Sequence, residues 1–371
     1  MTSPVVAGER TAAPRARKRR DDRIAAAVLL APSFAGFLVF YVYPALRGLW
    51  YSFTDFSMLK PPNFVGLDNY SAALGSTEVW DAFVVTVAYA AYNIIGQTFL
   101  GLLLAALMQR FARSTWVRSM LLLPWLVPNV AIALIWGWLL DANLGFVTHL
   151  LKGIGIEGVT FFNERAAMPI VAGINIWAYT GYTALLLYAG MLQIPGELYE
   201  SAALDGAGEA RMFFSITLPL LRPVLVLVFV MGLIGSFQIF DTVQIGYAGH
   251  PIPAVRVIYY YIYQQFTFLK MGYASAVAML LVCVLGVLTA SCASCARERR
   301  TWPERGAPVL RRIQASRVAA YIIIALAVLV TVFPFYWMIR TALTPQADLI
   351  ADSTRLWPSH PTLINFKRIL G

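Results

Sequence analysis

ELYESAALDGAGEARMFFSITLPLLRP, residues 197–223, is a polar interruption between two long apolar runs of this 371-residue chain. The run before it (168–192) and the run after it (223–247) are each long enough to cross the hydrocarbon core of a bilayer as a helix, which takes about 20 residues at about 1.5 Å per residue. The quoted segment is rich in small, charged and turn-forming residues, so it cannot continue either helix through lipid. The sequence therefore predicts a connection outside the membrane between two spanning helices.

Apolar runs of similar length recur along the chain. Only 13% of the residues are charged, about half the share of a soluble globular chain, which is about 25%. A spanning segment must be helical, because no water is present in the bilayer core to satisfy an exposed backbone. The predicted fold is therefore an all-α polytopic membrane protein with six helices and one extra C-terminal helix. The predicted spans are 24–46, 82–108, 119–140, 168–192, 223–247, 273–296 and 318–339.

The basic residues indicate the orientation of the chain. None of the 29 Lys and Arg residues falls inside a predicted span. With a cytoplasmic N-terminus, 19 of them lie in segments on the cytoplasmic side, which is the bias that sets membrane orientation. The net charge of +10 thus reflects topology and contact of the basic arm 1–23 with anionic lipid. Nucleic-acid binding is not expected, because the aromatic residues interleaved with basic stripes that mark such a site are missing.

Two short helices are predicted inside the quoted segment. Residues 197–204 form the first, Gly206 permits the left-handed turn that ends it, and residues 209–216 form the second, which ends at Leu218-Pro219. Small side chains would let another protein's backbone approach closely, and larger apolar ones would anchor it; these are Ala202, Ala203 and Ala207, with Tyr199, Met212 and Phe213. The simpler alternative is an ordinary re-entry loop with helical turns.

The motif in this segment resembles the EAA loop of binding-protein-dependent ABC transporter permeases, with Ser201 in place of the usual second alanine. In that family the loop docks into a cleft of the ATP-binding subunit, so the resemblance implies that the segment couples this chain to an ABC ATPase dimer. The residues that would carry the coupling are Glu200, Ala202, Ala203, Asp205, Gly206, Ala207, Phe213, Leu218 and Pro219.

Other stretches are similar to the carbohydrate-uptake (maltose and multiple-sugar) branch of the same permeases, over about residues 25–295. They are GLDNY (66–70), IPGELYESAALDGA (194–207), GSFQIFDTV (235–243) and VIYYYIYQQFTFLKMGYASAVAMLL (257–281). One departure is GYAGHP (246–251), where the family usually has a Gly-Gly-Pro turn.

The resemblance implies a multi-pass subunit of a bacterial cell-membrane importer for a sugar or polyol. Its partners would be a second permease subunit in a pseudo-symmetric heterodimer, and an extracellular solute-binding lipoprotein or periplasmic protein. ATP and Mg would be held by the separate ATPase subunits, and the chain contains no Gly-x-x-x-x-Gly-Lys-Ser/Thr phosphate loop. No catalytic residue or cofactor is expected in the chain. No metal is expected either, because Cys292 and Cys295 have ligand spacing but lack a second pair or a nearby His.

The end of the chain repeats its beginning. YVYPALRGLWYSF (41–53), followed by GLDNYSAAL (66–74), has a counterpart in TVFPFYWMIRTAL (331–343), followed by TLINFKRIL (362–370). We interpret this as an internal duplication of one structural unit; chance is the alternative, since aromatic–Pro pairs are common at membrane interfaces. The predicted domains are the arm 1–23, a transmembrane domain 24–296 with the coupling loop 193–222, a basic linker 297–317, and the start of a second permease unit, 318–371, which stops before its second span.

Polar side chains inside the spans are candidates for the transport route, because polar groups in lipid usually face a cavity or a partner helix. The candidates are Asn93, Gln97, Asn129, Asn175, Tyr179, Tyr182, Gln238 and Asp241. Hydrogen bonding between helices is the alternative role, and Asp241 is predicted near the outer surface, where a helix-end role is equally open.

No Lys or Arg lies at depth in the spans, so amide, hydroxyl and aromatic groups favour a neutral sugar over a phosphate ester, although a partner subunit could supply the cation. Glycerol 3-phosphate or another small solute remains an alternative cargo. An ion-coupled secondary transporter is disfavoured, because no ionisable relay is found at mid-bilayer. An intramembrane enzyme is disfavoured because His149, His250 and His360 are scattered and no His-Glu-x-x-His occurs.

Overall fold

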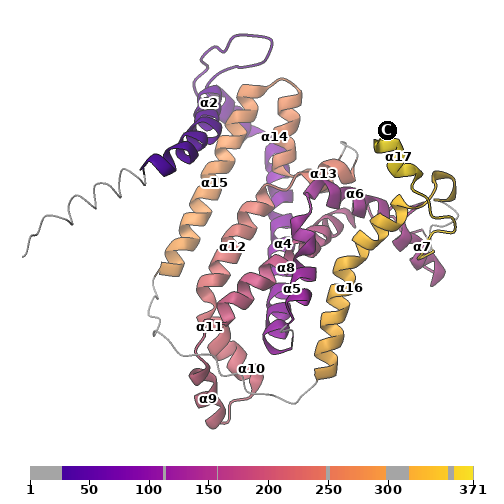
Figure 1. The fold of residues 1–371 in the computed structure, drawn as a ribbon. Helices are drawn as coiled ribbons and strands as arrows, with labels where there is room; N and C mark the ends of the chain where they lie inside the picture. The colour runs from indigo at the N-terminus through magenta and orange to yellow at the C-terminus, as the bar shows by residue number, and fades with distance from the viewer. Residues whose placement is uncertain are drawn as a thin grey trace, which may run out of the picture.

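The structure is a computed structural model that describes residues 27–111, 114–156, 158–247, 251–297, 317–349 and 355–370. Over these residues the chain forms an elongated bundle of helices, and extended pairing is limited to the isolated bridges Thr54–Phe64 and Ser57–Lys60 (Figure 1). The predicted all-helical class is confirmed. The arm 1–23 and most of the linker 297–317 lie outside the described residues.

Four helices make the centre of the bundle: α4 (Thr77–Arg110), α8 (Ala167–Met191), α12 (Arg222–Phe237) and α15 (Met271–Arg297). They match the second, fourth, fifth and sixth predicted spans, except that α12 is shorter. Where α8 crosses the end of α5 (Thr115–Leu122), a Cβ on Gly181 would lie 1.8 Å from the carbonyl oxygen of Leu121. Small residues of this kind let membrane helices approach closely.

The third predicted span, 119–140, is not one straight helix. It consists of α5, a 3₁₀ turn η2 (Leu123–Leu126) and α6 (Asn129–Leu139), and the two parts are bent by 93°. Pro124 and Pro128 lie at the break, and each lacks the N–H that a continuous helix would need.

The fifth predicted span, 223–247, is also broken, so the prediction of one helix there was wrong. Helix α12 ends at Phe237, and a separate short helix, α13 (Asp241–Gly246), follows after an irregular stretch. Non-helical backbone inside a membrane protein is tolerated where it is buried in protein or lines a cavity. Residues 238–241 of this stretch line a cavity between the helices.

One end of the bundle contains a helix that the sequence analysis missed. Helix α14 (Ile258–Thr267) pairs with α15 through a tight turn in which Leu269 has φ +60°. It follows the short turn η4 (Pro253–Val255). The stretch 246–251, whose sequence differs from the family's usual Gly-Gly-Pro turn, lies in this region. Residues 248–250 of it are outside the described part of the chain.

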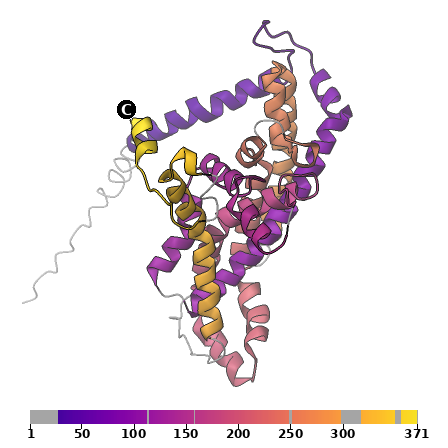
Figure 2. The same ribbon diagram turned by 90° about the vertical axis from the view of Figure 1, so that its right-hand side faces the viewer.

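The remaining elements lie at the edges of the bundle. The N-terminal helix Ala27–Tyr51 contains a π-helical turn, η1 (Leu38–Val42), before α2 (Tyr43–Tyr51), and it projects away from the bundle (Figure 2). Helix α16 (Arg317–Ala342) lies against α5 and α6. The shorter elements are α3 (Asp68–Gly75), α7 (Phe146–Gly153), η5 (Gln346–Asp348) and α17 (Ile364–Leu370). Five helices of the described residues are long and apolar enough to cross a membrane, or seven if each of two bent pairs counts as one span.

Candidate coupling segment and transport cavity

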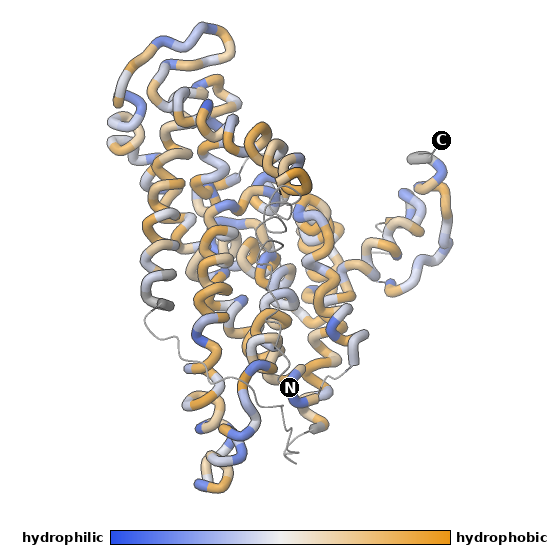
Figure 3. Tube along the Cα trace, turned by 60° about the vertical axis from the view of Figure 1, so that its left-hand side comes forward, coloured by the Kyte–Doolittle hydropathy of each residue, from blue (hydrophilic) through white to orange (hydrophobic). Residues whose placement is uncertain are grey.

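The segment between the fourth and fifth spans forms a projection at one end of the molecule, opposite the loop 52–67 (Figure 1). Its first helix is α9 (Gly196–Leu204), close to the predicted 197–204. Figure 3 shows hydrophobic residues along the bundle helices and a larger share of hydrophilic ones at this tip. We call residues 196–220 the coupling segment.

Gly206 closes helix α9 in the way its sequence predicts. Its φ is +78°, in the left-handed region that glycine adopts without steric cost. The backbone N–H of Ala207 donates to the carbonyl oxygen of Ala202 at 2.9 Å, and the N–H of Gly206 donates to that of Ala203 at 3.1 Å. These two bonds are the Schellman pattern, which satisfies carbonyls left open at a helix end. The tip of the coupling segment is therefore a defined turn.

The second half of the coupling segment differs from the prediction. Helix α10 (Glu209–Met212) continues through a π-helical turn, η3 (Phe213–Thr217), into α11 (Leu218–Leu220). Pro219 does not end this helical segment, which runs on to Leu220 after the π-helical turn. The break comes at Leu221 instead, and α12 leaves at 67° to the segment Glu209–Leu220.

The predicted coupling residues fall into two groups. Glu200, Ala203, Asp205, Gly206 and Pro219 are exposed, whereas Ala202, Ala207, Phe213 and Leu218 are half-buried. Sequence reasoning missed the two most exposed large apolar side chains of the segment, Leu204 at 86% and Phe214 at 65%. Of the predicted anchors, Phe213 packs inward on the cluster around Leu187, Met191 and Leu221. An apolar residue directly before the Asp205-Gly206 turn was the sequence signal that could have identified Leu204.

One polar contact braces the coupling segment internally, and another attaches it to the bundle. The hydroxyl groups of Tyr199 and Thr217 are 2.8 Å apart, which ties α9 to the end of η3. Burial raises the pKa of Tyr199 above its ordinary value, so the phenol is protonated at neutral pH. Arg110 at the end of α4 forms an ion pair with Glu209 at the start of α10. Both side chains of that pair are partly exposed, so it positions the segment more than it stabilises the fold.

All eight polar residues predicted for the transport route line one cavity of about 190 Å³. It lies among α4, α8, α12, the break in the third span and the start of α13. The lining also includes Trp125, Thr183, Met231 and Phe240. No Lys or Arg is among its lining residues, and its one acidic side chain is Asp241, half-buried in the first turn of α13.

Hydrogen bonds hold several of these polar side chains in place. Asn175 Nδ2 donates to Asn93 Oδ1 at 3.1 Å, and Asn93 Nδ2 donates to Ser236 Oγ at 2.9 Å, which joins α8, α4 and α12. Gln97 Nε2 donates to Thr183 Oγ1 at 2.6 Å. These amides thus line the cavity and also bridge helices, the two roles that the sequence left open.

An aromatic pair forms another wall of the cavity. The rings of Trp125 and Tyr182 stack at 4.7 Å between centroids and 9° between planes. The hydroxyl of Tyr179 on α8 donates to Oδ1 of Asn129, the first residue of α6, at 3.2 Å. Sequence reasoning missed Trp125, because an aromatic residue within an apolar run carries no polar signal.

The described residues contain no group of three or more His, Cys, Asp or Glu side chains placed to hold a metal ion. Cys283 and Cys292 are free cysteines. The side chain of Cys295 is outside the described part of the chain.

Comparisons with known proteins agree on one family. The family "Binding-protein-dependent transport system inner membrane component" matches residues 97–293. The chain is 34% identical over 274 residues to the sulfoquinovosyl glycerol transport system permease protein SmoG of Agrobacterium fabrum, covering 72% of this chain and 89% of that protein. It is 32% identical over 266 residues to the sn-glycerol-3-phosphate transport system permease protein UgpA of Shigella flexneri, covering 71% and 90%.

The fold has a counterpart among solved structures. A bacterial ABC transporter involved in the import of the acidic polysaccharide alginate contains a chain that superposes with a TM-score of 0.64 at 23% sequence identity. The match covers 76% of this chain and 98% of that chain.

Proposed function

We propose that this chain, which belongs to the family of inner membrane components of binding-protein-dependent transport systems, is a permease subunit of an ATP-driven importer for a sugar or related polyol. An external binding protein would deliver the cargo, and separate ATPase subunits would hydrolyse ATP. The relatives named above support this class of transporter, since both are permeases for polar carbon compounds.

The observation that carries the proposal is the coupling segment. It projects from the bundle, it ends in a defined Schellman turn, and it is continuous with two spanning helices. A short rigid projection transmits a push from a docked protein better than a mobile loop does. Exposed Leu204 and Phe214 offer apolar contacts, and Ala203 leaves room for a partner's backbone. We assign this tip to the ATPase subunits.

Force would reach the cavity by two routes. One runs from the segment Glu209–Leu220 directly into α12, whose far end opens into the irregular stretch before Asp241. The other runs through the Glu209–Arg110 ion pair into α4, which carries Gln97 and Asn93. A tilt of the coupling segment would thus change the position of helices on two sides of the cavity.

The cavity lining supports a neutral cargo. Amide and hydroxyl groups can hydrogen-bond the hydroxyls of a polyol, and the Trp125–Tyr182 pair offers an apolar aromatic wall to sugar C–H groups. An anion would need a nearby cation, and the lining contains Asp241 and no Lys or Arg.

An anionic cargo such as a glycerol phosphate is the second candidate, favoured by the names of the relatives. It would require a cation from the partner permease. Competition of labelled sugar uptake by neutral polyols and by sn-glycerol 3-phosphate distinguishes the two cargoes.

Reconstitution tests the proposed function. The chain would be co-expressed with its membrane partners, purified, and placed in proteoliposomes with the external binding protein. The proposal predicts sugar uptake that requires internal ATP and survives collapse of proton and sodium gradients. Uptake that needs an ion gradient and no ATP would instead identify an ion-coupled transporter.

A further inference from the structure

A second cavity lies at the end of the molecule opposite the coupling segment, among the loop 52–67, α3, α14 and the start of α15 (Figure 1). Its volume is about 650 Å³ and it opens to the surface. Pockets that bind small molecules usually measure about 300–1,000 Å³. None of its lining residues also lines the transport cavity, so the two are separate. We call it the end pocket.

Backbone contacts fix the walls of the end pocket. Asn69 Nδ2 donates to the carbonyl oxygens of Ser52 at 3.0 Å and Thr54 at 2.8 Å, which holds the loop against α3. The N–H of Gly272, at the start of α15, donates to the carbonyl oxygen of Phe56 at 3.0 Å. A Cβ on Gly272 would lie 2.0 Å from the carbonyl oxygen of Thr54, so this approach requires glycine. The pocket is therefore formed in advance, which lowers the cost of binding a ligand.

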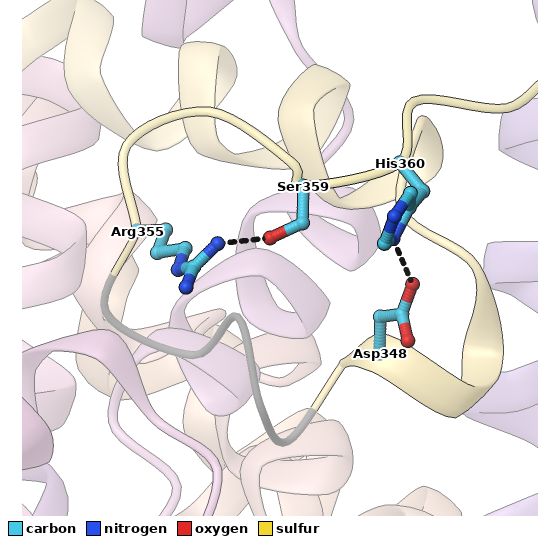
Figure 4. A network of polar contacts seen from close by, with 4 residues as sticks. All are labelled: Asp348, Arg355, Ser359 and His360. Atoms are coloured by element: carbon cyan, nitrogen blue, oxygen red, sulfur yellow. Dashed lines mark hydrogen bonds and ion pairs between the residues drawn. The ribbon is translucent and has the colours of Figure 1, made fainter.

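The asparagine clamp recurs in the C-terminal segment. Asn365 Nδ2 donates to the carbonyl oxygens of Ala342 at 3.0 Å and Thr344 at 2.9 Å. The loop there is held by two side-chain pairs of its own, which are Arg355 with Ser359 and Asp348 with His360 (Figure 4). The clamp is thus common to both segments, and the hairpin of α14 and α15 adds the end pocket to the first.

A buried amide lies in the wall of the end pocket. Gln265 on α14 is only 6% exposed, and it lines the pocket. Its side-chain amide forms no hydrogen bond with any other residue that the structure describes. Burying an unpaired amide is unfavourable, because its hydrogen bonds to water are lost. The position of Gln265 therefore favours a ligand with groups that both donate and accept hydrogen bonds.

Hydroxyl groups and aromatic rings surround this amide. Tyr261 is 2% exposed, and its hydroxyl lies 3.3 Å from that of Tyr273. Ser76, which precedes the first residue of α4, also lines the pocket. The ring of Phe56 is held by stacking on Tyr51 at 4.1 Å between centroids. Amides and hydroxyls suit the hydroxyl groups of a sugar, and aromatic rings suit its C–H groups.

The charged residues of the end pocket are exposed at its rim. They are Asp55, Glu78 and Lys270. The backbone N–H of Asn63 donates to Asp55 Oδ1 at 2.7 Å, and this bond, with a second one from the Asn63 side chain, lowers the pKa of the Asp55 carboxyl. Two carboxylates against one ammonium disfavour an anionic ligand. Carboxylates accept hydrogen bonds from hydroxyl groups, so the rim also fits a neutral sugar.

We propose that the end pocket is a binding site for a neutral mono- or oligosaccharide, distinct from the transport cavity. Sugar hydroxyls would bond to the amide of Gln265 and to the carboxylates of Asp55 and Glu78. The C–H groups of a sugar ring would pack on the rings of Tyr261 and Phe56. This inference goes beyond the proposed function and does not rest on it, because it involves neither the coupling segment nor the transport cavity. A protein partner fits less well, because the core of a protein interface is depleted in charged residues.

Protection of an introduced cysteine tests the proposal in the full chain, purified in detergent, with its native cysteines replaced by serine. Ala72→Cys places the thiol in the lining of the end pocket, and Ser71→Cys places it on the next residue of α3, outside the lining. Both positions are exposed. Alkylation by a maleimide is timed with D-glucose, sucrose or raffinose, which differ in ring number. At least one sugar should slow alkylation at position 72 severalfold and leave the rate at position 71 unchanged.

A pair of neighbouring glutamines supplies the second comparison. Gln265→Leu removes the buried amide, so it should abolish the protection at position 72. Gln264→Leu makes the same change at a half-buried residue outside the lining, and it should leave the protection intact. Thermal unfolding in detergent identifies any variant that does not fold, and the comparison of positions 72 and 71 holds without either glutamine variant.

The proposal is overturned if none of the sugars slows alkylation at position 72, or if they slow it equally at position 71. Protection that persists in folded Gln265→Leu also overturns it. Protection by sn-glycerol 3-phosphate alone would assign the pocket to an anion, and protection by the external binding protein alone would make it a protein-docking surface; both results contradict a sugar site. Cargo uptake is measured separately in proteoliposomes, so failure of the transport function is distinguished from failure of this site.

Discussion

The backbone N–H of Ala207 donates to the carbonyl oxygen of Ala202 at 2.9 Å, and this bond closes the tip of the coupling segment. It can form only because Gly206 between them has φ +78°. The residue type at one position thus determines the shape that a docking partner meets.

Gly206→Pro should abolish cargo uptake while ATP hydrolysis by the assembled complex persists. Proline fixes φ near −65° and removes the N–H that donates to Ala203, so the Schellman turn is lost while the spans are untouched. Gly206→Asn should retain more uptake than Gly206→Ala, because asparagine tolerates the left-handed region, which costs other residues about 1–2 kcal/mol.

The matched control is Gly208→Ala. Gly208 has φ −70° and open space around its Cα, so the same added methyl group should leave uptake unchanged. Uptake and ATP hydrolysis are measured in proteoliposomes at equal protein abundance. Normal uptake by Gly206→Pro would contradict the assignment of this turn to coupling.

Tyr199→Phe should weaken coupling without unfolding the chain. The substitution removes the hydroxyl that pairs with Thr217 at 2.8 Å, a contact worth about 1 kcal/mol. We expect fewer sugars imported per ATP hydrolysed, because α9 is no longer tied to η3. A double-mutant cycle with Thr217→Val checks this: the two changes should be less than additive, and strict additivity would show that the pair does not act as a unit.

Trp125→Leu should raise the KM for cargo uptake about 2- to 10-fold, since a stacked aromatic contact is worth about 0.5–1.5 kcal/mol. Trp125 stacks on Tyr182 in the cavity wall. Trp116→Leu is the control, because Trp116 is exposed on α5 and does not line the cavity. Equal effects of the two substitutions on KM would argue that the cavity is not on the cargo route.

Gly181→Ala should destabilise the bundle, whereas Gly173→Ala on the same helix should not. A Cβ on Gly181 would lie 1.8 Å from the carbonyl oxygen of Leu121, while one on Gly173 meets open space. Overpacking of this kind typically costs about 1–3 kcal/mol. Thermal unfolding of the purified chain in detergent measures the difference, and identical melting curves would refute the close approach of α8 and α5.

Local signals in the sequence predicted some elements well. The α9 helix followed from its short helical run and Gly206, and both features act within a few residues. The polar cavity residues were predictable because a polar group in a spanning helix needs a partner or a cavity. Asn93 and Gln97 meet both conditions at once.

Tertiary contacts decided the elements that the sequence analysis missed. The runs 119–140 and 223–247 are apolar enough to be predicted as single spans, although Pro128 and Asn129 lie at the first break and Gln238 and Asp241 at the second. Helix α14 is rich in tyrosine, which has modest helix propensity, and it is stabilised by packing on α15. Helix Ala27–Tyr51 has no buried residue in its apolar window, and nothing in its own residues distinguishes it from the buried spans.

Site-specific cross-linking from the tip of the coupling segment tests the central claim most directly. Ala203→Cys, in a chain whose native cysteines are replaced by serine, carries a short photoreactive maleimide in membranes that import sugar. Leu59→Cys, which is exposed in the loop at the opposite end of the molecule, carries the same label as the control. The account predicts an adduct with an ATPase subunit from position 203, with a yield that changes on addition of ATP, and none from position 59. Absence of any ATPase adduct from position 203 in actively importing membranes would contradict it.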